Sequence, residues 1–358
     1  MQETIEPLNI PITVITGFLG SGKTTLLSSL IKNDKMANTA VIINEFGEVG
    51  LDHLLVEHSK ENIIELESGC ICCTIRSDLQ KTLRELISKR LKGDINQFNR
   101  LVIETTGLAD PVPIVHTLIN SFNLQKNYFL DGVIALVDAV NGGKTLDAYP
   151  EALKQAAMAE LIILSKTDLT DNETKTSLVN RLRAINPSVK IILGNFGAVS
   201  ISEIFGYNAY DPYGKSKDVN EWLAIEKIEK HHHHQHENDV NKHDDNIQAF
   251  AITKDAPVNM IAFALFRDLL KAQMGSDLLR VKGIINISGK EFPAVVHGVQ
   301  HVFHPVQWLD VWPSKDRQTK IVFITRNIKK EEIEDLFNAL FTVAENKGIE
   351  TAINILDN

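Results

Sequence analysis

Apolar and polar positions alternate on two different scales along the first two hundred residues. Short, continuously apolar runs predict buried strands at 12–16, 40–43, 101–104, 132–138, 161–165 and 190–193. Between them, apolar residues recur at helical spacing and predict helices at 23–32, 77–91, 113–119, 151–159 and 172–184. Buried strands separated by helices are typical of a parallel sheet covered on both faces. We therefore expect an α/β domain.

This pattern ends in a polar stretch at residues 206–246, which holds six of the twelve histidines. Such a stretch buries too little apolar surface to order itself, so we expect a flexible linker. Beyond it, strands are predicted at 248–253, 279–288, 294–303 and 320–325, and helices at 258–273 and 330–342. The sequence thus predicts an α/β domain over 1–205, a linker over 206–246 and a smaller α+β domain over 247–358.

Composition narrows the classes of function. The 358 residues are 44% hydrophobic and 23% charged, with a formal net charge of −9, which disfavours a general nucleic-acid or anionic-membrane partner. No uninterrupted apolar run is long enough for a membrane span, and the acidic N-terminus lacks the pattern of a secretory signal. All three cysteines fall within residues 70–73, so they cannot staple distant segments. We expect a cytoplasmic protein.

A phosphate-binding loop is predicted between the first strand and the first helix. Residues 17–24, Gly-Phe-Leu-Gly-Ser-Gly-Lys-Thr, match the G-x-x-x-x-G-K-[ST] pattern in the context that its mechanism requires. A purely structural glycine turn is the alternative, which this context disfavours. The α/β domain is therefore predicted to be a P-loop NTPase. We assign the nucleotide phosphates to Gly17, Gly20, Ser21, Gly22, Lys23, Thr24 and Thr25.

Two later strand ends complete a predicted nucleotide site. Glu104 ends an apolar strand, as expected of a carboxylate near Mg²⁺, and Gly107 is placed to offer its N–H to the γ-phosphate. Taken alone, Glu104 is more commonly explained as a solvated strand end. With Lys23 and Thr24 it forms the predicted catalytic set, Thr24 and Glu104 being the Mg²⁺ ligands.

A guanine-reading segment is predicted after the strand at 161–165. Ser165, Lys166 and Asp168 resemble the N/T-K-x-D motif, in which the carboxylate accepts two hydrogen bonds that guanine donates and adenine does not. Ser165 stands where many GTPases have asparagine. The alternative is a serine that caps a strand end, followed by an aspartate that caps a helix. The nucleotide is therefore predicted to be GTP.

The three thiols predict a metal site. Cys70, Cys72 and Cys73 form a C-x-C-C array, and thiolate is a soft ligand that suits Zn²⁺ and related ions. Three thiolates leave one tetrahedral position for a fourth ligand, which the spacing does not identify. Buried cysteines acting as small hydrophobic residues are the alternative.

These motifs together resemble the CobW-type P-loop GTPases, the cobalamin-synthesis and zinc-metallochaperone proteins. The resemblance rests on residues 16–25, 44–48, 69–73, 104–111 and 165–168, and on Gly298-Val299-Gln300 followed by Trp308. It implies a GTPase whose thiolates bind Zn²⁺, or Co²⁺ or Ni²⁺, in a way coupled to the nucleotide, and which delivers that ion to a client metalloprotein. Glu48 matches a metal-ligand position of the family, whereas Ile43 stands where some members carry a further glutamate ligand.

The histidines divide into two groups. The first group is a tract whose imidazoles suit transition metals: His231, His232, His233, His234 and His236. The alternative interpretation is a polar spacer in which the histidines are incidental. In the predicted strand 294–303 and just beyond it, His297 and His301 are expected on one face and His304 on the other. For these three, ordinary core or surface positions are favoured over metal ligation.

The leading hypothesis is a GTP-hydrolysing metallochaperone that uses GTP, Mg²⁺ and Zn²⁺. A metal buffer or storage protein with regulatory nucleotide binding is an alternative of another class. A further alternative is a cobalt-handling factor for cobalamin or nitrile hydratase, which would use the same nucleotide and thiolate sites but a different metal and client. The sequence leaves the oligomeric state open, with a homodimer among the assemblies considered.

Overall fold

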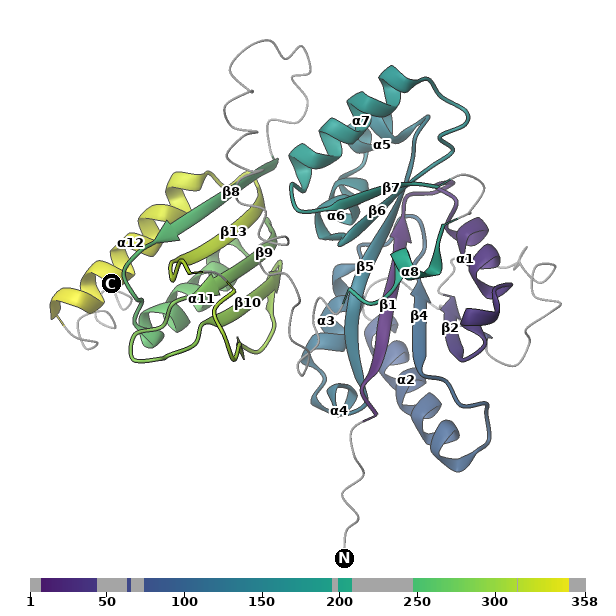
Figure 1. The fold of residues 1–358 in the computed structure, drawn as a ribbon, viewed down its shortest axis with the longest axis horizontal. Coiled ribbons are helices and arrows are strands. Elements are labelled where there is room, and N and C mark those ends of the chain that lie inside the picture. The colour runs from purple at the N-terminus through teal and green to yellow at the C-terminus, as the bar shows by residue number, and fades with distance from the viewer. Residues whose placement is uncertain are drawn as a thin grey trace, which may run out of the picture. The chain divides into compact units, whose positions relative to one another are not determined.

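Seven parallel strands build the sheet of the first unit (Figure 1). The computed structural model describes residues 8–43, 63–65, 74–194, 199–207, 247–313 and 315–347. The strand order is β3-β2-β4-β1-β5-β6-β7. The strands are β1 (Ile10–Gly17), β2 (Thr39–Ile43), β3 (Ile63–Glu65), β4 (Arg100–Glu104), β5 (Tyr128–Asp138), β6 (Leu161–Ser165) and β7 (Lys190–Leu193).

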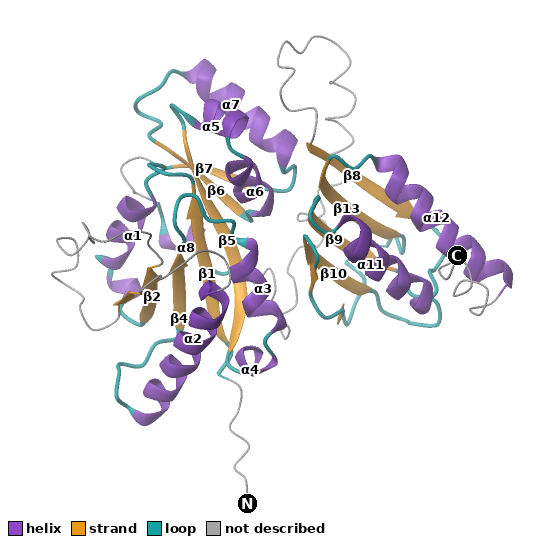
Figure 2. Ribbon diagram, turned by 180° about the vertical axis from the view of Figure 1, so that it is seen from behind, coloured by secondary structure: helices purple, strands orange, loops and turns teal. Residues whose placement is uncertain are grey.

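Helices cover both faces of this sheet. On one face α1 (Lys23–Ile31) and α8 (Ile201–Ile204) bury apolar side chains against β1, β4 and β5. Seen from behind, α2 (Thr74–Lys92) and α3 (Val112–Asn120) lie over the other face (Figure 2). The remaining helices are the 3₁₀ turn Asp34–Met36, α4 (Phe122–Gln125), α5 (Gly142–Ala148), α6 (Pro150–Met158) and α7 (Asn172–Ile185).

Register brings the candidate site residues to one edge of the sheet. Ile15 pairs with Glu104, Gly17 pairs with Leu136, and Asp138 pairs with Ser165. Because all these strands are parallel, their carboxyl ends and the loops that follow them emerge at the same edge. Ligands of open α/β sheets bind at this edge, where the chain passes from one strand to the next.

In the second unit, the residues that the structure describes form an antiparallel sheet with two helices. Its strand order is β11-β10-β9-β13-β8, and β12 pairs with β10. An aromatic core joins α11 and α12 to the sheet, with Phe266 and Phe337 edge to face at 5.1 Å between ring centroids. The elements are β8 (Ile247–Lys254), α11 (Met260–Met274), β9 (Leu278–Ile285), β10 (Ala294–Val299), β11 (Val302–Phe303), β12 (Gln307–Trp308), β13 (Thr319–Arg326) and α12 (Lys330–Lys347).

The predicted fold class is confirmed: a parallel sheet flanked by helices is accompanied by a smaller α+β unit. Every strand and helix predicted in residues 1–193 is present, with ends that differ by a few residues. The sequence did not predict the short elements β3, α4, α5, α8 and β12 or the 3₁₀ turn Asp34–Met36.

One predicted strand is wrong. Residues 294–303 form not one strand but β10 and β11, joined by a turn in which Gln300 adopts a positive φ of 51°. The turn removes His301 from the strand face that it was expected to share with His297. It returns the chain so that the His304 backbone N–H donates to the His297 carbonyl at 2.9 Å, and the two rings lie 6.1 Å apart.

Within the described ranges, no helix is both long and apolar enough to cross a membrane.

Candidate functional site

The loop after β1 has the shape of a phosphate cradle. Gly20 and Gly22 have φ values of +73° and +97°, which residues with a side chain rarely adopt. The Ser21 N–H donates to the Phe18 carbonyl at 3.1 Å, and Gly22 caps α1, its carbonyl accepting from Leu26. The loop thus ends at a helix N-terminus, where backbone N–H groups and the helix dipole favour an anion.

Lys23 is held inside this loop. Its ammonium donates to the Gly17 carbonyl at 2.8 Å and to the Phe18 carbonyl at 3.2 Å, and the residue is 8% exposed. These two carbonyls fix the position of the charge beside the cradle. The ammonium is thereby kept at the loop rather than in solvent.

Thr24 and Glu104 meet across the edge of the sheet. The Thr24 hydroxyl donates to Glu104 Oε1 at 3.3 Å, and Glu104 is 5% exposed. The Thr105 N–H donates to the Ile15 carbonyl at 2.9 Å, so the β1–β4 pairing continues past Glu104 and fixes its backbone. A hydroxyl and a carboxylate are hard oxygen donors, which Mg²⁺ requires, so this pair fits the predicted Mg²⁺ ligands.

Gly107 lies directly against the phosphate loop. A Cβ at this position would come within 2.6 Å of the Leu19 backbone nitrogen, so only glycine permits the contact. On its other side the Gly107 carbonyl accepts from the side-chain amide of Gln155 on α6. Gly107 is therefore held between the loop and α6.

The guanine-reading segment is tied to the phosphate loop. The Ser165 hydroxyl donates to the Ser21 carbonyl at 2.6 Å, so the serine supplies a tether where asparagine is usual. Lys166 has a positive φ of 55°, and its ammonium lies 2.7 Å from Asp138 Oδ2. Asp168, two residues further on, is exposed.

Asp138 is a site residue that the sequence did not suggest. Burial raises the pKa of its carboxyl, but hydrogen bonds from Lys166, Val140 and Asn141 outweigh burial and leave the pKa below its ordinary value. The carboxylate is therefore ionised at neutral pH and holds the lysine of the guanine-reading segment. Its position at the end of the β5 apolar run is the one signal that could have indicated it.

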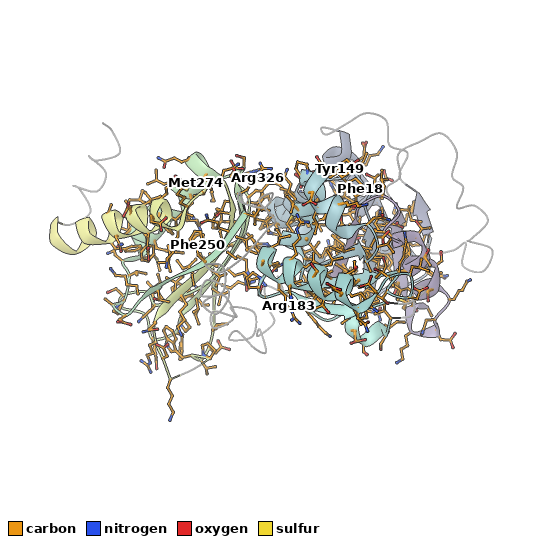
Figure 3. All side chains as sticks on the ribbon, turned by 90° about the horizontal axis from the view of Figure 1, so that it is seen from above. Phe18, Tyr149, Arg183, Phe250, Met274 and Arg326 are labelled. Atoms are coloured by element: carbon orange, nitrogen blue, oxygen red, sulfur yellow. The ribbon has the colours of Figure 1, made fainter. Side chains whose placement is uncertain are left out.

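A cavity of about 270 Å³ opens beside the phosphate loop. Its lining includes Phe18, Asp138, Gln155 and Lys166. The Phe18 ring lies 4.4 Å from the Tyr149 ring, centroid to centroid, and both are labelled in Figure 3. The cavity therefore borders both the phosphate loop and the guanine-reading segment.

The predicted metal residues fall outside the described ranges. This applies to the three cysteines, the loop glutamate and the histidine tract: Cys70, Cys72, Cys73, Glu48, His231, His232, His233, His234 and His236. Within the part of the chain that the structure describes, no group of three or more His, Cys, Asp or Glu side chains is arranged to hold a metal ion. His297 and His304 are buried core side chains, as favoured from the sequence.

Comparison with known proteins gives matches along most of the chain. Residues 11–193 match the family model "CobW/HypB/UreG, nucleotide-binding domain", and residues 247–341 match "Cobalamin synthesis protein cobW C-terminal domain". The chain is 34% identical over 331 residues to zinc chaperone YjiA of Escherichia coli, covering 92% of this chain and 98% of that protein. It is 31% identical to zinc chaperone CobW of Pseudomonas aeruginosa, covering 90% and 89%.

A solved structure shares the fold. The crystal structure of Zn(II)-bound YjiA GTPase from E. coli matches with a TM-score of 0.69 at 29% sequence identity, covering 93% of this chain and 99% of that chain. Each of the two units therefore has the same fold as the corresponding part of that protein.

Proposed function

Because the chain belongs to the CobW/HypB/UreG family of P-loop GTPases, we propose that it binds and hydrolyses GTP and carries Zn²⁺ to client metalloproteins. One observation supports the nucleotide half most strongly. The phosphate loop, the Thr24–Glu104 pair and the Ser165–Asp168 segment converge at one edge of the sheet and are joined by hydrogen bonds. These three parts are what a Mg²⁺-dependent GTPase requires.

In the proposed reaction, water attacks the γ-phosphorus of GTP, the bond to the β–γ bridging oxygen breaks, and GDP and phosphate are released. Lys23 neutralises charge on the β- and γ-phosphate oxygens from the position that Gly17 and Phe18 fix. Thr24 and Glu104 would hold Mg²⁺, which supplies further charge neutralisation on the phosphates. The Gly107 N–H is proposed to donate to the γ-phosphate. Most of the rate enhancement then comes from positioning and electrostatics.

Guanine selection is assigned to Asp168 and Lys166. The Asp168 carboxylate accepts from guanine N1–H and the 2-amino group, and adenine has neither donor in that arrangement. The stem of Lys166 lies along the base while Asp138 holds its ammonium. This selection supports GTP over ATP as the substrate.

The metal half of the proposal rests on residues outside the described ranges. Zn²⁺, or alternatively Co²⁺ or Ni²⁺, would bind the thiolates of Cys70, Cys72 and Cys73 with Glu48 nearby, and the tract His231–His234 with His236 would gather metal. The segment 1–205 would be the GTPase domain, 206–246 a linker and 247–358 the C-terminal domain. We further propose that the protein is cytoplasmic, that it transfers metal to a client metalloprotein and that it forms a homodimer.

A metal titration of the purified full chain tests this function. Zn²⁺ affinity is measured with a non-hydrolysable GTP analogue and with GDP, for the wild type and for Cys72→Ala, and GTP turnover is measured in parallel. Coupling is reciprocal, so if the GTP analogue tightens Zn²⁺ binding, Zn²⁺ must tighten binding of the analogue by the same factor. Equal Zn²⁺ affinity in the two nucleotide states would refute the coupling. Absence of turnover with any metal or client would favour the metal-buffer alternative.

A further inference from the structure

Lys154 and Gln155, two neighbouring residues of α6, hydrogen-bond to the segment 107–110 that follows β4. The side-chain amide of Gln155 donates to the Gly107 carbonyl at 3.2 Å and to the Ala109 carbonyl at 3.1 Å. The ammonium of Lys154 donates to Asp110 Oδ2 at 2.8 Å. Residues 107–110 are thus attached to α6 at three points, whereas β4 itself ends at Glu104.

The two bonds from Gln155 use both hydrogens of one amide nitrogen, and the side chain is 2% exposed. Water therefore does not replace it easily as a donor to these carbonyls. Lys154 and Asp110 differ in this respect, since their side chains are 22% and 29% exposed and solvent weakens their attraction. Of the three points, those made by Gln155 fix the backbone most firmly.

Fixing a carbonyl fixes the peptide plane that contains it. In a trans peptide the N–H of Leu108 points opposite to the Gly107 carbonyl, so it is directed away from α6. The opposite side of Gly107 lies against Leu19, where even one added carbon would come within 2.6 Å. Gln155 thus fixes the Gly107–Leu108 peptide from α6, while Gly107 itself contacts the phosphate loop, so both N–H groups of this segment are restricted in position.

We propose that Gln155 is a positioning residue for GTP hydrolysis, which holds the 107–109 backbone where it can donate to the γ-phosphate. This inference rests on the proposed GTPase function and names a residue that the phosphate-loop, carboxylate and guanine-reading motifs do not include. The amide nitrogen of Gln155 is engaged by the Gly107 and Ala109 carbonyls, so we assign this residue no direct contact with the nucleotide. It acts through Gly107, and its contribution is specific to the nucleotide state that carries a γ-phosphate.

Gln155→Leu tests the inference, because leucine fills most of the same volume but donates no hydrogen bond. Gln155→Glu is the second variant, since it places acceptor oxygens against two carbonyls. Glu151→Gln is the matched control, on the same helix and without a role in this contact. For each full-length protein we would measure kcat and KM for GTP and affinities for GDP and a non-hydrolysable GTP analogue. We would also measure the melting temperature of each protein and, without nucleotide, the amide hydrogen exchange of residues 107–110.

The expected result for Gln155→Leu is a loss of kcat of about tenfold to a hundredfold, the range that misplacement of a reacting group produces. Affinity for the GTP analogue falls while affinity for GDP stays within about twofold, because GDP has no γ-phosphate. Exchange at 107–110 rises in both Gln155 variants and not in the control. If Gln155→Leu melts too low to assay, the inference is tested with Gln155→Glu, for which the same changes in kcat, nucleotide affinity and hydrogen exchange are expected.

Two outcomes overturn the inference separately from the proposed function. If the wild type hydrolyses GTP and folded Gln155→Leu keeps its kcat, the positioning role is wrong. If GDP and the GTP analogue lose affinity equally, Gln155 has a merely structural role. A wild type that hydrolyses no GTP under any condition overturns the proposed function, and the inference falls with it.

Discussion

The contact between Gly107 and the phosphate loop permits a quantitative test with one added carbon. In Gly107→Ala, the new Cβ would lie 2.6 Å from the Leu19 nitrogen and 2.7 Å from its Cα, where ordinary contacts begin at 3.4 Å. Backbone atoms cannot rotate away as a flexible side chain does. The 107–110 segment and the phosphate loop must therefore separate by roughly 0.8 Å, the difference between 2.6 and 3.4 Å.

A displacement of that size is large for a group that contacts a transferring phosphoryl. Misplacement by about 1 Å costs on the order of a hundredfold in rate, or about 2.7 kcal/mol of transition-state stabilisation. GDP affinity is expected to change little, because the displaced segment is proposed to contact the γ-phosphate, which GDP lacks. Single-turnover hydrolysis with excess enzyme isolates the chemical step, and fluorescence titration of a labelled GDP gives the affinity.

Gly143→Ala is the matched control. Gly143 lies in α5, where an added Cβ meets no atom within 4 Å, and replacing glycine by alanine in a helix stabilises it by about 1 kcal/mol. Its hydrolysis rate should equal that of the wild type. The steric argument is refuted if Gly107→Ala hydrolyses GTP at the wild-type rate, or if its GDP affinity falls as far as its rate.

Three further predictions concern base selection and pH. Asp168→Asn should shift kcat/KM from GTP toward XTP, because the amide can donate to the C2 carbonyl of xanthine; a variant that keeps its GTP preference would contradict the guanine assignment. Asp138→Asn should destabilise the fold by about 1–2 kcal/mol at pH 7, and its urea midpoint should converge with that of the wild type as the pH falls below 3.8, where the carboxylate becomes protonated. Burial lowers the pKa of His304 from 6.5 to about 3, so the unfolded chain binds a proton that the folded chain does not, and stability is lost as pH falls from 6.5 toward 3. His304→Phe should reduce the loss of stability between pH 7 and pH 5 in urea unfolding, with the part due to buried His297 remaining, and an unchanged loss would count against it.

Local sequence patterns predicted the long elements and the motifs because both are encoded over short stretches. The run 161–164 is continuously apolar and is followed by polar residues that begin at Ser165, and β6 ends at Ser165. Short elements escaped prediction. β3 has three residues and α5 begins with two glycines, so their stability comes from packing rather than from propensity.

Contacts between distant residues could not be predicted in the same way. Gln155 is 48 residues from Gly107, and Lys166 is 28 residues from Asp138. A glutamine in an alanine-rich amphipathic helix carries no sign of its partner until the helix is placed beside the loop. The turn at Gln300 was missed for a related reason. Apolar residues occur on both sides of it in the sequence, while the backbone reverses.

The strand order has a consequence for synthesis of the chain. β1 has its two neighbours in β4 and β5, which begin 90 and 118 residues after Ile10. At about 5–20 residues per second, a ribosome needs roughly 4–17 seconds between the end of β1 and the start of β4. During that interval both edges of β1, a strand that is almost entirely buried in the folded domain, lack their partners and can mispair with other nascent chains. The yield of folded protein should therefore depend more on how well chaperones protect β1 during synthesis than on the stability of the finished sheet.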